Sequence, residues 1–182
     1  MRPDVAWHAA SVGAAAALEA HARSLLGPGT VTSGRLCSAC GSDAHGRPWV
    51  RHLGEPLHVS LARSGPHLVT AIALVDGGVP VGVDVEVAAI DVLPSLVLAP
   101  SEAPGSAGDL ARTWARKEAI LKARGTGLAT PMSTIVLAEE TWQDLPAPEG
   151  YVAALAGLGH ASTGTSAGSS TWMSADEVLH SA

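Results

Sequence analysis

Hydrophobic residues alternate with polar or small residues along PVGVDVEV, residues 80–87. In an extended strand this period of two places the valines on one face and Gly82, Asp84 and Glu86 on the other. Carboxylates two residues apart on a strand lie about 7 Å from each other, where two like charges repel by roughly 2 kcal/mol at an effective dielectric of about 20. We therefore expect a neighbouring group that offsets the repulsion between Asp84 and Glu86.

Other apolar segments predict more strands. Five runs have the length and composition of a β-strand: residues 57–62, 67–75, 79–87, 132–140 and 150–157. The sequence DGG at 76–78 is a turn signal, and it predicts a hairpin between the second and third runs. The first three runs predict an antiparallel core, and each of the last two predicts a further strand.

Two segments have a helical pattern. Residues 9–26 predict a first helix that ends at GPG, and a loop through CGSDAHGRP follows it. Residues 109–124, DLARTWARKEAILKAR, predict a second helix with Asp109 as its N-cap and Gly125 as its stop. The three prolines of residues 88–108 predict an irregular connection or a broken helix.

The second helix carries a candidate site on one side. A spacing of i, i+3, i+4, i+7 and i+8 relates five of its residues: Trp114, Lys117, Glu118, Leu121 and Lys122. Alone, Glu118 and Lys122 are typical of a surface ion pair worth a few tenths of a kcal/mol. Together with Asp84 and Glu86, however, they offer three carboxylates and nearby lysines, which suit a divalent cation and a phosphate-bearing substrate.

Composition and charge exclude several classes of protein. The 182 residues suffice for one domain with a sizeable core. No segment has about 18 uninterrupted apolar residues, and charges interrupt the N-terminal apolar stretch, so we expect a cytoplasmic protein that does not bind membranes. The net charge of −6 argues against nucleic-acid binding, which needs a basic face.

The only two cysteines form a CSAC pair, Cys37 and Cys40, and His45 follows shortly after. A structural zinc site normally takes four ligands, and the sequence has no second pair. We therefore expect reduced cysteines that are incidental to the structure. A small zinc-binding interaction domain and a redox dithiol are the alternatives.

Two motifs together resemble a known family. VGVDVE at 81–86 and WARKEAILKARGTGL at 114–128 resemble the G-[IV]-D-x-E strand and W-x-x-K-E-x-x-x-K helix of the 4'-phosphopantetheinyl transferase superfamily. Three upstream features resemble its Sfp-type branch: HARSLLG at 21–27, the GRP that closes the loop at residue 48, and HVSLARSG at 58–65.

The resemblance implies an activity and its site residues. Relatives transfer the phosphopantetheine arm of coenzyme A to a serine of an apo acyl or peptidyl carrier protein in fatty-acid or secondary metabolism, releasing 3',5'-ADP. By analogy, Asp84, Glu86 and Glu118 hold Mg²⁺, and Lys122 neutralises the leaving group. Either Glu118 or a water on the metal takes the serine proton. The coenzyme A contacts are expected from Arg23, Arg47, Pro48, Arg63, Lys117 and Lys122.

The chain departs from the family pattern at one phosphate-binding position. Relatives have Ser-His-Ser or Ser-His-Thr where this chain has Ala62, Arg63 and Ser64. Arginine also binds phosphate, so Arg63 is expected to replace the histidine. A competing alignment places Ser60 at the first serine of this motif, and no phosphate-binding residue then stands in place of the histidine. The interval before Trp114 is also shortened, so a partly degenerate paralog that binds coenzyme A or a carrier without efficient turnover is the alternative.

The resemblance also implies a fold. Relatives are α+β proteins of two similar lobes related by a pseudo-twofold axis, each a small antiparallel sheet packed with a helix, with the active site in the cleft between them. We expect this domain over residues 1–158, a Ser/Gly/Thr-rich tail over 159–182, and a monomer, with a dimer as the alternative. A basic patch for an acidic carrier is expected from Arg112, Arg116, Lys122 and Arg124.

Overall fold

The computed structural model describes residues 2–37, 39–75, 78–103 and 105–157, so the predicted tail at 159–182 lies outside the described residues. Two antiparallel sheets form the architecture. The larger sheet has the order β1-β5-β4-β3-β2, with bounds Asp4–Ala9, His67–Leu74, Glu55–Ser64, Arg47–His52 and Val31–Leu36. The smaller sheet has the order β6-β8-β7, with bounds Gly82–Val87, Tyr151–Ala156 and Trp142–Leu145.

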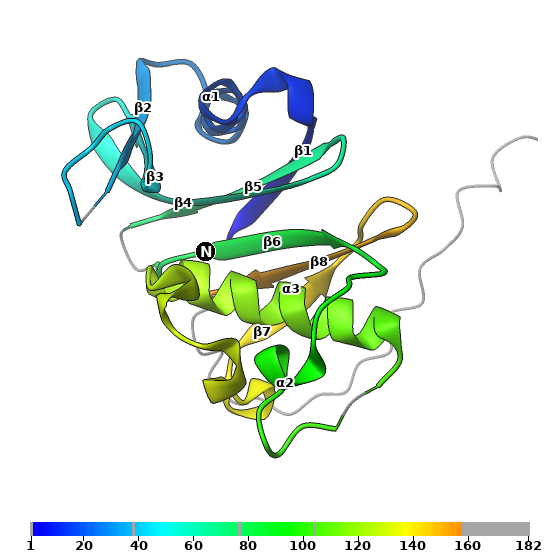
Figure 1. Ribbon diagram of the computed structural model, residues 1–182. Coiled ribbons are helices and arrows are strands. Elements are labelled where there is room, and N and C mark those ends of the chain that lie inside the picture. The colour runs from blue at the N-terminus through cyan, green and yellow to red at the C-terminus, as the bar shows by residue number, and fades with distance from the viewer. Residues whose placement is uncertain (1, 38, 76–77, 104, 158–182) are drawn as a thin grey trace, which may run out of the picture.

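The sheets and helices form layers (Figure 1). Helix α1 (Ala14–Leu26) lies on the outer side of the larger sheet, and the long helix α3 (Ala107–Arg124) lies along the smaller sheet. A short helix, α2 (Pro94–Val97), interrupts the connection between β6 and α3. The prediction of an α+β protein with antiparallel sheets is confirmed. No helix of the described part is long and apolar enough to cross a bilayer.

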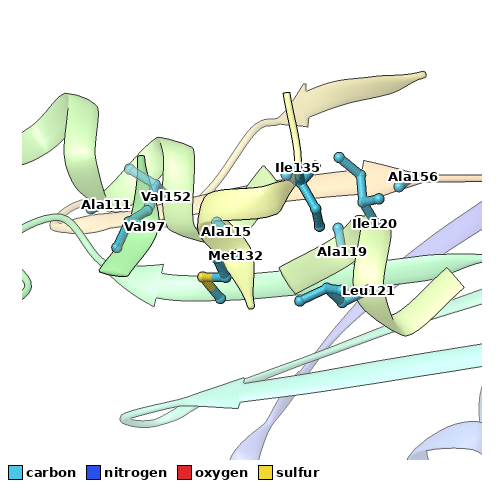
Figure 2. Packing of buried hydrophobic residues seen from close by; sticks show 11 residues of the cluster. Val97, Ala111, Ala115, Ala119, Ile120, Leu121, Met132, Ile135, Val152 and Ala156 are labelled. Carbon is cyan, nitrogen blue, oxygen red and sulfur yellow. The ribbon is translucent and has the colours of Figure 1, made fainter. Parts of the chain in front are cut away.

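Three hydrophobic clusters fill the spaces between these layers. The first joins α1 to the larger sheet, and it includes Leu18, Ala22 and Ile72. The second lies between the two sheets: Ala62, Val69, Ala71, Val81, Val83, Val85, Ala153 and Leu155. The third packs α3 and α2 against the smaller sheet, with Ala115, Ala119, Val152 and Ala156 among its members (Figure 2). Strand β6 therefore turns its valines towards the larger sheet, as the alternation predicts.

Helix α3 has well-defined ends. Ser106 is its N-cap, and the Ser106 and Asp109 side chains each accept from the other's backbone N–H in a capping box. The prediction of Asp109 as the N-cap is therefore wrong by three residues. Gly125 ends the helix in the left-handed conformation, as predicted. Gly82 lets the helix approach β6, because a Cβ there would lie 1.9 Å from the Ala119 carbonyl oxygen.

Several predicted elements differ in the structure. The predicted hairpin is wrong: β5 pairs with β4 and β1, whereas β6 begins the second sheet and pairs with β8. Residues 132–140 form two 3₁₀ turns, Met132–Thr134 and Leu137–Glu139, and no strand. Strands β1, β2, β3 and β7 were not predicted from the sequence. The helix expected from residue 9 begins at Ala14, after a 3₁₀ turn, Ala10–Val12.

Candidate active site

Asp84 lies between β6 and α3, on the β6 face that is turned away from the larger sheet. The residue as a whole is only 4% exposed. Lys122 from α3 donates from Nζ to Asp84 Oδ1 at 2.6 Å and to the Val83 carbonyl oxygen at 3.3 Å. The other oxygen, Oδ2, is buried and accepts no hydrogen bond from the described residues. A buried carboxylate oxygen without a partner is costly, and it marks a position where a cation would be stabilised.

Burial and neighbouring charges govern the ionisation of these carboxyls. Burial raises the pKa of Asp84 to about 7, because it outweighs the opposing effect of Lys122, and the negative charges of Glu118 and Glu86 raise it further. Burial also raises the pKa of Glu118, against the effect of Lys122 and with a further rise from Glu86. The repulsion expected between Asp84 and Glu86 is therefore present, and Lys122 offsets part of it.

The three carboxylates lie on two packed elements, β6 and α3, without converging fully. Glu118 projects from α3, and Glu86 follows Asp84 on β6 with a partly buried side chain. Among the described residues, their oxygens do not all lie within 4.8 Å of one another. Three carboxylates, one of which has a buried unpaired oxygen, offer the hard oxygen donors that Mg²⁺ prefers, so the residues present fit this ion.

A groove of about 330 Å³ adjoins Lys122. Its walls come from β2, β3 and β4 of the larger sheet and from the end of α3, and they include Arg35, Arg47, Ser60 and Lys122. A second hollow of about 720 Å³ continues from it and shares Gly46, Arg47, Pro48 and Gly125 with it. Three cationic side chains along one groove are suited to a ligand with several phosphates.

A family model matches residues 80–152, which contain β6, α3 and all three carboxylates. The matching model is that of the 4'-phosphopantetheinyl transferase superfamily. The resemblance predicted from the two motifs is confirmed, and the match supports a transferase. No curated protein is similar enough to the chain to count as a match.

Some of the site residues predicted from the resemblance lie at the groove. Three of the residues that we expect to contact coenzyme A line it: Arg47, Pro48 and Lys122. Arg35 and Ser60 line it too. Sequence reasoning missed Arg35, because strand β2 shows no apolar alternation that would have placed it. Ser60 had a signal in the competing alignment, and its hydroxyl accepts from the Val83 N–H at 3.1 Å.

Other predicted residues lie elsewhere. Lys117 is completely buried, and its ammonium donates to Glu102 at 2.5 Å and to the carbonyl oxygens of Val97 and Met132. In this arrangement it supports the connection between β6 and α3 and cannot reach a phosphate, so its predicted contact with coenzyme A is corrected.

Neither of the other two predicted arginines lines the groove. Arg23 lies on α1 and donates to Glu19 at 3.3 Å. Arg63 is exposed on β4. Neighbouring side chains on a strand point to opposite faces of the sheet, and Ala62 packs towards β6, so Arg63 lies on the other face. Both arginines therefore belong to the α1 side of the larger sheet.

The expected basic patch on α3 is largely neutralised. Arg116 makes two hydrogen bonds to Asp144, at 2.8 and 2.6 Å, and its guanidinium stacks 4.1 Å above the Trp142 ring. Arg124 pairs with Glu140. These acidic partners neutralise part of the positive charge, so the charge available to attract an acidic carrier protein is smaller than the number of arginines predicts.

Proposed function

We propose that the protein transfers the 4'-phosphopantetheine group of coenzyme A to a serine of an apo acyl or peptidyl carrier protein and releases 3',5'-ADP. The observation that carries this proposal is Asp84, a buried carboxylate with one unpaired oxygen beside Glu86, Glu118 and Lys122. A cationic groove adjoins it. A site of this kind suits a pyrophosphate substrate that is bound together with a divalent cation.

Asp84, Glu86 and Glu118 would hold Mg²⁺. When bound, the ion supplies a Lewis acid that stabilises negative charge on the pyrophosphate oxygens. Lys122 donates to Asp84 and also lines the groove, so its ammonium can bind either Asp84 or a phosphate oxygen of the substrate. Arg35 and Arg47 would bind the remaining phosphates of coenzyme A, with the groove acting as the cleft between two lobes.

The transfer forms one bond and breaks one bond. The carrier serine oxygen bonds to the phosphorus next to the pantetheine arm, and the bond from that phosphorus to the 3',5'-ADP oxygen breaks. Glu118 accepts the serine proton, because burial raises the pKa of its carboxyl and makes it a stronger base. Lys122 neutralises the charge that develops on the leaving group.

The experiment is intact-mass analysis of a panel of apo carrier proteins after incubation with the protein, coenzyme A and Mg²⁺. We expect a mass gain of one phosphopantetheine, lost with EDTA and with Glu118→Gln but retained with Glu149→Gln, an exposed carboxylate control. The position of Arg63 off the groove favours a second candidate, a paralog that binds coenzyme A without turnover. No mass gain, with calorimetric binding of coenzyme A intact, would support this second candidate.

A further inference from the structure

The loop between β2 and β3 brings three metal-ligating side chains together, apart from the carboxylate site. The ligand atoms of Cys37, Cys40 and His45 all lie within 4.8 Å of one another, and no other group of three among the described residues is this close. Cys40 Sγ and His45 Nε2 are 3.5 Å apart. Tetrahedral zinc, with Zn–S of about 2.3 Å and Zn–N of about 2.05 Å, separates sulfur and nitrogen ligands by about 3.5 Å. The spacing is thus already that of a zinc ligand pair.

The backbone holds the loop in this shape. The Cys37 N–H donates to the Ser42 carbonyl oxygen at 2.9 Å, and the Gly41 N–H donates to the Cys37 carbonyl oxygen at 2.8 Å. Gly41 adopts a φ of 72°, which favours glycine. These two hydrogen bonds keep Cys37 close to the residues that follow Cys40.

Ligand type and exposure distinguish this loop from the carboxylate site. Two sulfurs and an imidazole are softer donors than carboxylates, and they select zinc over magnesium. Both cysteines are free, Cys40 is exposed and Cys37 is partly buried, so an ion can enter from solvent. The missing second cysteine pair argued against zinc at the level of sequence, but three protein ligands and a water are also a common zinc coordination.

We propose that Cys37, Cys40 and His45 form a tetrahedral Zn²⁺ site whose fourth ligand is water. Binding replaces one proton on each thiol, so two thiols and one Zn²⁺ give a zinc dithiolate and two released protons. The ion would fix the loop from its first cysteine to His45.

The loop leads directly into the groove. Gly46 accepts a hydrogen bond from Arg35 Nη1 at 3.0 Å, and Arg47 follows it in the groove wall. A fixed loop would therefore hold both arginines for the phosphates of coenzyme A. This consequence rests on the proposed function, and it predicts that zinc lowers the KM for coenzyme A without changing kcat. The existence of the metal site does not rest on it.

The test is a titration of the reduced, metal-free protein with Co²⁺, followed by displacement with Zn²⁺. We expect one equivalent of Co²⁺ to produce a sulfur-to-cobalt charge-transfer band and the intense visible bands of tetrahedral cobalt, both abolished by Zn²⁺. The charge-transfer band reports thiolate ligands, so it separates this site from ion binding at Asp84.

Three variants make the test specific to the loop. Cys37→Ser and His45→Ala should remove the tetrahedral spectrum, whereas Ser42→Ala, in the same loop, should retain it. Each variant is first checked for an unchanged circular dichroism spectrum and melting temperature. A charge-transfer band and tetrahedral bands that survive Cys37→Ser, or reduced thiols that take up no metal, would overturn the proposal.

Discussion

Asp84 is the residue on which the proposed activity depends most, since one of its oxygens is buried without a partner. We expect Asp84→Asn to lower kcat/KM for coenzyme A by at least about 100-fold, because even groups that only hydrogen-bond to a metal's ligands contribute about 10- to 100-fold. The free energy of unfolding at pH 8 without added metal should stay equal or rise. Burial already disfavours the charged carboxyl and raises its pKa to about 7.

Glu149→Gln is the matched control for this prediction, because Glu149 is an exposed carboxylate of the same domain. Urea denaturation and the transfer assay, run on both variants, separate activity from stability. A loss of stability in Asp84→Asn as large as its loss of activity would show that Asp84 serves the fold instead.

The lowered pKa of Glu102 predicts that the stability of the protein depends on pH. Desolvation acts to raise the pKa of Glu102, but hydrogen bonds from the Leu137 N–H, Lys117 and the Ala99 N–H together lower it below the usual 4.5. The unfolded chain therefore binds this proton more readily than the folded protein, so the stabilisation is present above about pH 4.5 and is lost as the pH falls through the folded pKa.

The comparison is urea denaturation of the wild type and Glu102→Gln between about pH 7 and pH 3. At pH 7 the variant should be less stable by roughly 3 kcal/mol, because Lys117 is then buried without its partner charge. The difference should shrink as the pH falls. A difference that is constant across this range would contradict the role assigned to the carboxylate.

At the scale of elements, Gly82 sets the distance between β6 and α3. A Cβ on Gly82 would lie 1.9 Å from the Ala119 carbonyl oxygen and 2.5 Å from the Ala123 nitrogen. We expect Gly82→Ala to displace α3 and to reduce stability by about 1–3 kcal/mol, as overpacking typically does. Transfer activity should fall with it, because Glu118 and Lys122 move with the helix.

Gly108 provides the control, since it lies inside the first turn of α3 and its Cβ would meet nothing closer than 3.6 Å. Gly108→Ala should raise the melting temperature, because alanine favours helix by about 0.5–1 kcal/mol over glycine. Thermal denaturation of both variants checks the pair. Equal melting temperatures for the two would refute the close contact at Gly82.

The elements that were predicted from the sequence are those whose apolar and polar residues repeat with a clear local period. Strand β6 alternates valine with polar residues, and α3 combines helix-forming residues with a glycine stop, so both elements were predicted, and the three carboxylates lie on them. The pairing of the strands was not predictable. Strand β6 pairs with β8, which lies some 65 residues further along the chain, and no local sequence pattern specifies so distant a contact. The burial of Lys117 likewise depends on Glu102, in a segment without regular pattern.

At the scale of the whole molecule, Ser60 connects the two sheets. β6 is an edge strand of the smaller sheet, and the Val83 N–H on its free edge donates to Ser60 Oγ of β4 at 3.1 Å. Ser60→Ala would leave this N–H buried without its partner, at a cost of about 1–3 kcal/mol. The second hydrophobic cluster contains residues of both sheets, so we expect both sheets to lose this stability together.

Hydrogen exchange with mass spectrometry measures this coupling. In Ser60→Ala, exchange through global unfolding should accelerate by a similar factor in peptides from β4 and β5 and in peptides from β6 and β8. Ser64→Ala is the control, because it makes the same change on the same strand, and Ser64 has no side-chain hydrogen bond to the described residues. The groove takes its walls from the larger sheet and from α3, which packs on the smaller sheet. If the two sheets unfold only together, the groove stays intact for as long as the protein is folded. Faster exchange confined to β6 and β8 would instead show that the smaller sheet opens independently of the larger sheet.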